Sequence, residues 1–233
     1  MTGAPRVVAG DDGLLRRGAG RTVFALGLPL AFGLASHALI NLVDLLLVGR
    51  LGEGAVRAAH VASTWNFLPM IVGNCVSTAL LARLSRALGT DDGMRARQLH
   101  RRAQVFMLWL GAAIGLGAAL PAGWMVAATG LEGAVAGDAH HYLVVANLGC
   151  LPMFALMQTT AAMRAAGEAW VPLALLLLAN ALNLALDLVL MFGWDAVGVP
   201  AFGVVGAAYA SVAGRLVAAG LRSEEHTSEL QSH

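Results

Sequence analysis

Six long apolar runs constrain this chain more than any other feature of its sequence. A helix that crosses the hydrocarbon core of a membrane needs about 20 predominantly apolar residues. Runs of this kind cover residues 23–49, 58–84, 103–130, 141–163, 170–192 and 202–221. Only 12% of the residues are charged, whereas a soluble domain has about a quarter. We therefore predict an all-α integral membrane protein with a bundle of six transmembrane helices, because helices satisfy their own backbone hydrogen bonds within lipid.

The arginines indicate how the bundle is oriented. All 15 basic residues are arginines, and basic residues in short loops remain on the cytoplasmic side. With the N-terminus in the cytoplasm, only Arg50 and Arg57 fall in an outer connection. Six arginines lie between residues 83 and 102, at the end of the second run and in the connection to the third, which then faces the cytoplasm. The sequence predicts a cytoplasmic N-terminus, with residues 1–20 as a cytoplasmic segment.

Two aspartates lie inside the apolar runs, where a carboxylate costs about 2.5 to 3.5 kcal/mol on insertion scales. Asp44 shares one stripe of the first predicted helix with His37 and Asn41, because residues three and four positions apart lie on one helix face. A helix with one polar stripe in lipid turns that stripe toward protein or water. We expect Asp44 to carry function, since a structural hydrogen bond does not need an ionisable group.

The second aspartate, Asp187, repeats the pattern in the fifth run. Asn180, Asn183 and Asp187 form a polar stripe on an otherwise apolar helix. Two such helices in one bundle predict a shared polar chamber. A carboxyl group in a low-dielectric chamber holds a proton more readily than one in water, which is the physical basis of proton coupling. A sodium ion could use the same oxygens together with the amide carbonyl of Asn180 or Asn183, so the ion stays open.

Three further features have two readings each. Asn66 and Gln158 could line the chamber together with His37 and Asn41, or they could simply form hydrogen bonds between helices, worth about 0.6 kcal/mol each. Pro29 removes a backbone hydrogen bond within the first run and is either a static kink or a moving hinge. The small-residue rows 111–119 and 203–213 either let helices pack closely, which we favour, or border a ligand.

No signature of an enzyme occurs in the sequence. It has no HExxH motif, no GxSxG elbow, no phosphate-binding loop and no dinucleotide glycine fingerprint. We expect no catalytic residue, no metal site, no cofactor and no nucleic-acid partner. Cys75 and Cys150 lie in apolar runs and are expected as small buried side chains. Without a nucleotide site, uphill work would come from an ion gradient.

Several spaced motifs resemble the multidrug and toxic compound extrusion (MATE) family. LPLAFGLASHALINLVDLLLVGRLGEGAVRAAHVAS at 28–63 looks like the first helix and following turn of these transporters. MRAAGEAWVP at 163–172 is similar to their connection between the fourth and fifth helices, NLALDLVLMFG at 183–193 to their fifth helix, and GVVGAAYAS at 203–211 to the start of the sixth. The resemblance extends over residues 21–221.

The resemblance implies roles for individual residues. Asp44, Asn183 and Asp187 would form the cation or proton site, and Ser211 stands where a threonine often lines that site. Pro29 matches a proline at which the first helix of some members bends.

The resemblance also implies a molecular context. Family members have twelve helices in two six-helix lobes and export cationic or amphipathic drugs by antiport against protons or sodium ions, in a bacterial-type inner membrane. Residues 21–221 would be the N-terminal lobe, with a C-terminal lobe, the bilayer and a small-molecule drug as partners. Residues 222–233, RSEEHTSELQSH, resemble a translated sequencing adapter and are expected to be non-native.

Three other functions remain open on the sequence. A related lipid or polysaccharide flippase would share the fold, although such lobes generally have a more cationic cavity. An intramembrane enzyme could use the two aspartates, because such pairs can share a proton. A purely structural membrane subunit would tolerate replacement of both aspartates by leucine.

Overall fold

The computed structural model describes residues 19–90 and 93–231, which form a bundle of helices. Within this part of the chain, regular strands are absent and Trp194 and Val199 form one isolated bridge. The elements in order are α2 (Ala19–Gly49), α3 (Glu53–Gly89), α4 (Gly93–Ala119), α5 (Ala122–Ala127), α6 (Gly133–Leu148), α7 (Cys150–Ala165), α8 (Trp170–Phe192), η1 (Asp195–Val197) and α9 (Val204–Gln231).

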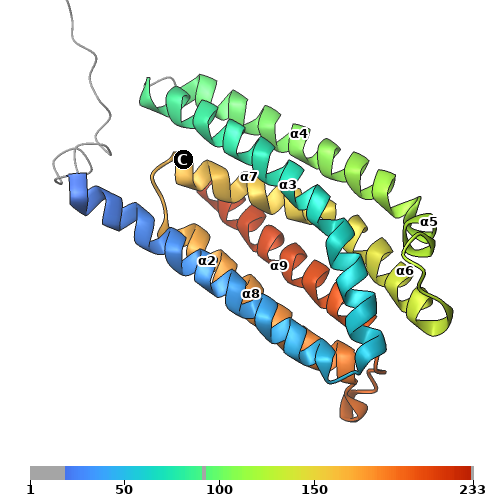
Figure 1. The fold of residues 1–233 in the computed structure, drawn as a ribbon. Helices are drawn as coiled ribbons and strands as arrows, with labels where there is room; N and C mark the ends of the chain where they lie inside the picture. Colours follow the sequence, from blue (N-terminus) through green and yellow to red (C-terminus); the bar gives the residue numbers. More distant parts are fainter. Residues whose placement is uncertain (1–18, 91–92, 232–233) are drawn as a thin grey trace, which may run out of the picture.

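The helices pack in an order that differs from their order in the chain. Helix α2 lies along α8 on one side of the bundle, while α3 and α4 run along the opposite side, with α7 and α9 between them (Figure 1). Helix α8 packs against α9, and α4 packs against α7. The first and fifth predicted spans are therefore neighbours.

The predicted membrane bundle is confirmed. Five segments are long and apolar enough to cross a membrane: Gly27–Gly49, Glu53–Gly89, Gly93–Ala119, Gly133–Ala165 and Trp170–Phe192. The sixth predicted span corresponds to a shorter apolar stretch, Val204–Gly220. Large apolar side chains such as Phe24, Leu34 and Trp109 are exposed on the bundle surface, as expected for helices in lipid.

The third and fourth predicted spans differ from the observed helices at their boundaries. The third run was expected to continue to residue 130, but α4 ends at Ala119 and the short helix α5 follows. The helix breaks at Pro121, because proline lacks the backbone N–H that would continue the helical hydrogen bonds. The fourth span begins at Gly133 rather than at residue 141, and α6 passes into α7 at Gly149. Helix α6 therefore begins in polar residues that precede the fourth apolar run.

Glycines in both small-residue rows allow the helices to approach closely, as predicted. A β-carbon built on Gly115 of α4 would lie 2.6 Å from the backbone oxygen of Asn147 in α6. One built on Gly206 of α9 would lie 2.6 Å from the backbone carbonyl group of Leu190 in α8. A β-carbon does not approach another heavy atom this closely in real proteins, so both contacts require glycine. Cys150 is buried beside this packing as predicted, whereas Cys75 is exposed.

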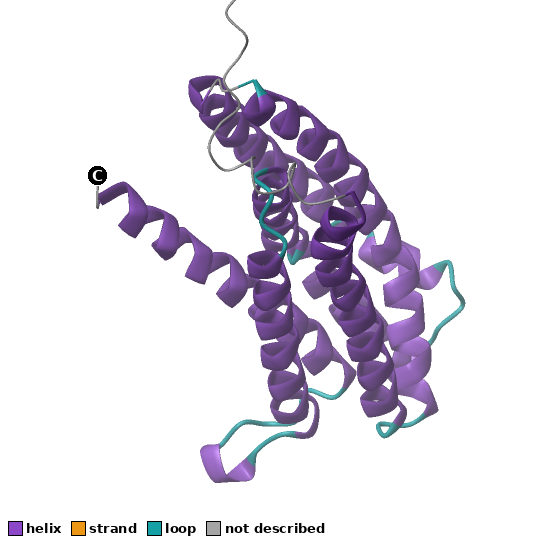
Figure 2. Cartoon of the chain, turned by 90° about the vertical axis from the view of Figure 1, so that its left-hand side faces the viewer, coloured by secondary structure: helices purple, strands orange, loops and turns teal. Residues whose placement is uncertain are grey.

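The two ends of the chain bear on the predicted division into segments. Residues 1–18 of the predicted cytoplasmic segment lie outside the described residues. The predicted boundary at 222 falls within α9, which continues as a helix to Gln231. The last turns of α9 extend away from the other helices (Figure 2).

Candidate functional site

The two aspartates of the membrane-spanning helices meet between α2 and α8. The carboxyl group of Asp44 is half-buried, and that of Asp187 is fully buried, with 0% of its surface exposed. The two groups lie within hydrogen-bond reach of each other. Two ionised carboxylates can only accept hydrogen bonds, so a bond between them requires a proton on one of them. The polar stripes predicted on the two helices therefore meet at Asp44 and Asp187.

No donor among the described residues bonds the carboxylate oxygens of Asp187. One oxygen of Asp44, Oδ1, is likewise buried without such a partner. A buried carboxylate without a donor is costly, and the cost disappears when a proton or a cation binds to it. A proton or a cation at the pair would therefore lower the cost of burying these carboxylates.

Hydrogen bonds from two asparagines of α8 fix the surroundings of the pair. Asn183 Nδ2 donates to Ser211 Oγ of α9 at 3.3 Å. Asn180 Nδ2 donates to Ser36 Oγ of α2 at 2.9 Å. Both asparagines use the amide nitrogen, which leaves the carbonyl oxygen as the group that could face a cation. Ser36 is a partner that the sequence reading did not identify.

A cationic residue and a phenol complete the polar interior. Arg215 of α9 interacts electrostatically with Asp44 and with Tyr142 of α6. Tyr142 in turn lies within electrostatic range of both Asp44 and Asp187. Arg215 was not predicted as a site residue, because spacing along α9 does not show which helix it faces.

The remaining members of the first stripe lie outside the bundle interior. His37 and Asn41 are exposed on the surface of α2, although His37 interacts electrostatically with Asp44. Asp44 is thus the inner end of a stripe whose other residues face outward. Their predicted lining of a cavity stays a prediction, since it depends on what lies beside α2.

The other predicted lining residues lie on different helices. Asn66 of α3 is half-buried, and Gln158 of α7 is buried with its Oε1 atom lacking a partner among the described residues. Asn147 of α6 is buried too, and neither of its amide atoms has a partner there. The sequence reading missed Asn147, although the signal used for Asn66 and Gln158, an amide within an apolar run, also applies to it.

The described residues hold no group of three or more His, Cys, Asp or Glu that could bind a metal ion. Carboxylate and amide carbonyl oxygens, the groups of Asp44, Asp187 and the two asparagines of α8, are hard ligands. Pro29 is buried inside α2, and the helix continues through it.

Comparison with known proteins identifies relatives of the chain in sequence and in structure. The sequence model of the MatE family matches residues 29–189. The chain is 30% identical over 205 residues to the probable multidrug resistance protein NorM of Rhizobium meliloti, covering 86% of this chain and 42% of that protein. It is 29% identical over 196 residues to the protein of the same name in Agrobacterium fabrum, covering 82% of this chain and 41% of the relative. The chain thus spans about two fifths of the length of these relatives.

Solved structures share the fold. A MOP superfamily transporter from Pyrococcus furiosus superimposes with a TM-score of 0.78 at 23% identity, covering 93% of this chain and 46% of the other. A structure of MATE in complex with MaD5 superimposes with a TM-score of 0.82 at 22% identity, covering 93% of this chain and 48% of the other. At these identities the likeness concerns the arrangement of helices.

Proposed function

Because the chain belongs to the MatE family, whose model matches residues 29–189, we propose that it acts in a secondary transporter that exports drugs against an ion gradient. The family is one of multi-pass membrane transporters rather than enzymes. The proposed substrates are cationic or amphipathic small molecules, and the proposed driving force is antiport against protons or sodium ions.

The Asp44–Asp187 pair carries this proposal. It joins two peripheral helices, α2 and α8, and Asp187 has no hydrogen-bond donor among the described residues. A carboxyl pair of this kind changes its energy strongly when it gains or loses one positive charge, because no hydrogen-bond donor among the described residues stabilises the carboxylate of Asp187. Binding of a proton or a cation would therefore favour one packing of α2 against α8, and release would favour another.

Arg215 lies within electrostatic range of Asp44 and contributes to the charge balance of the pair. Its guanidinium group offsets one carboxylate, so the three groups together would be neutral with one proton on the carboxyl pair. Loss of that proton leaves one uncompensated negative charge in the bundle interior. This is the state in which a proton or a sodium ion would bind, with Asn183 and Asn180 offering carbonyl oxygens and Ser211 holding the amide of Asn183.

The rest of the proposal concerns the complete transporter. We propose that a second lobe, supplied by a C-terminal half, faces this one across the substrate pathway, and that His37, Asn41, Asn66 and Gln158 border that pathway. Pro29 is the proposed hinge of α2. The proposed location is a bacterial-type inner membrane with the N-terminus in the cytoplasm, supported by the concentration of arginines in the connections on that side.

The test is drug efflux by the complete transporter with Asp44→Asn, Asp187→Asn and, as a matched control, Asp195→Asn. Asp195 is exposed in η1, so its replacement removes the same charge far from the pair. We expect the first two variants to lose efflux at wild-type membrane expression and the control to keep it. Wild-type efflux by Asp187→Asn would refute the proposed role of the pair.

The ion is identified separately by collapsing one gradient at a time in vesicles. If protons drive export, a protonophore stops dye efflux while an imposed sodium gradient does not restore it. If sodium drives export, a sodium gradient alone restores efflux. Efflux that is insensitive to both gradients would refute antiport against these ions.

A further inference from the structure

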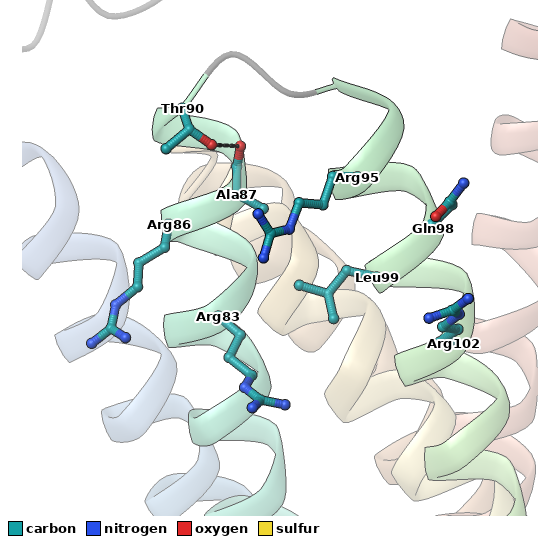
Figure 3. A pocket seen from close by; sticks show the side chains of 8 residues that line it. All are labelled: Arg83, Arg86, Ala87, Thr90, Arg95, Gln98, Leu99 and Arg102. Atoms are coloured by element: carbon teal, nitrogen blue, oxygen red, sulfur yellow. Dashed lines mark hydrogen bonds between the residues drawn. The ribbon is translucent and has the colours of Figure 1, made fainter.

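A basic pocket lies where α3 ends and α4 begins (Figure 3). Its volume is about 490 Å³. Arg83 and Arg86 line it from α3, and Arg95 and Arg102 line it from α4, together with Gln98 and the apolar side chain of Leu99. The described lining residues include no acidic side chain. The pocket is separate from the Asp44–Asp187 pair, and the transport proposal gives it no role.

The charge of this region favours an anion. The sequence between residues 83 and 102 holds six arginines and two acidic residues, Asp91 and Asp92, which lie outside the described residues. The segment therefore keeps an excess of positive charge even with both carboxylates counted. The planar guanidinium group donates two parallel hydrogen bonds to phosphate oxygens, so arginines from two helices around one pocket suit a phosphate group.

The face of α4 that carries the pocket residues changes from cationic to apolar within a few turns. Arg95, Gln98 and Arg102 are three and four residues apart, and the same spacing continues to Val105 and Trp109. Val105 is 49% exposed and Trp109 is 74% exposed. A free phosphate ion would use only the cationic half of this face, whereas a phospholipid would place its headgroup on the arginines and its acyl chain along the apolar half.

From this arrangement we propose that the α3–α4 pocket binds the phosphate headgroup of an anionic phospholipid, whose acyl chain lies along the exposed face of α4. Basic pockets between membrane helices are suited to such headgroups. The site positions one lipid at the end of the bundle, at the level where the helices leave the hydrocarbon.

The experiment measures binding of phosphatidylglycerol and phosphatidylcholine to the full chain in detergent by native mass spectrometry. The pocket variant is Arg83→Gln with Arg102→Gln. The matched control is Arg97→Gln with Arg101→Gln, which removes two exposed arginines of α4 that do not line the pocket. We expect phosphatidylglycerol to bind the pocket variant about 30-fold more weakly than the control, which corresponds to about 1 kcal/mol for each arginine.

Two further arms separate a lipid from free phosphate. Excess inorganic phosphate should displace little phosphatidylglycerol, and Trp109→Ala should weaken lipid binding while leaving the pocket arginines in place. Circular dichroism of every variant establishes that the helices are retained, and Trp109→Ala tests the lipid directly if the arginine variant unfolds. Equal lipid binding by pocket and control variants, equal binding of both lipids, or complete displacement by inorganic phosphate would overturn the proposal.

Discussion

Two parts of the bundle pack their helices in opposite ways. Within Gly133–Ala165, which comprises α6 and α7, 50% of an 18-residue apolar window is buried, compared with 17% of such a window in Gly27–Gly49 of α2 and 17% in Trp170–Phe192 of α8. In the α6–α7 region, the backbone packs directly against the glycines of α4. The α2–α8 contact instead encloses two carboxyl groups. We infer that the first region determines whether the bundle folds, and that the second can rearrange when an ion binds.

The largest effect on stability is expected at the glycine contact between α4 and α6. A β-carbon at Gly115 would lie 2.6 Å from the oxygen of Asn147, so Gly115→Ala must displace a backbone, at about 1 to 3 kcal/mol of unfolding free energy. Gly117→Ala is the matched control, because a β-carbon there meets nothing within 4 Å. Thermal unfolding in detergent should show a clear loss for the first variant only. Equal unfolding temperatures for Gly115→Ala and Gly117→Ala would mean that the glycine contact between α4 and α6 can rearrange as readily as the α2–α8 contact.

A smaller effect is expected where α8 contacts α9 through a side-chain hydrogen bond. Ser211→Ala removes the acceptor of Asn183, and hydrogen bonds between membrane helices contribute about 0.6 kcal/mol on average. Ser63→Ala is the control, since the Ser63 hydroxyl bonds the backbone oxygen of His60 on its own helix. The same unfolding assay should rank Ser211→Ala between Gly115→Ala and the control. A loss as large as that of Gly115→Ala would place Ser211 in the structural core.

The smallest effect on stability is expected at the carboxyl pair itself. Asp187→Asn keeps the shape of the side chain, lets its amide donate to Asp44 and leaves the same net charge as the pair with one proton. The free energy of unfolding should therefore change by less than the ~0.6 kcal/mol expected for Ser211→Ala. Thermal unfolding beside Asp195→Asn checks this. If Asp187→Asn instead unfolds the bundle, the pair holds the helices together, and the contrast between the two regions is lost.

Part of the site could be predicted from sequence because helical spacing alone decides it. Asp44 and Asp187 stood out as carboxyl groups within apolar runs, and spacing placed each on a polar stripe. Spacing also grouped Asp44 with His37 and Asn41, yet the structure leaves those two exposed while Asp44 turns inward. A stripe on a helix spans a wide angle, and only the neighbouring helices decide which part of it is buried.

The sequence by itself determined the class of protein, the apolar helices and the presence of two aspartates within them, because hydrophobicity and helical spacing are local properties. Only the tertiary structure decided that α2 lies beside α8, that Arg215 and Tyr142 join the carboxyl pair, and that Asn147 is buried. These contacts bring together residues from distant parts of the chain. Which helices become neighbours depends on how closely their surfaces can pack, and the glycines at Gly115 and Gly206 set that distance.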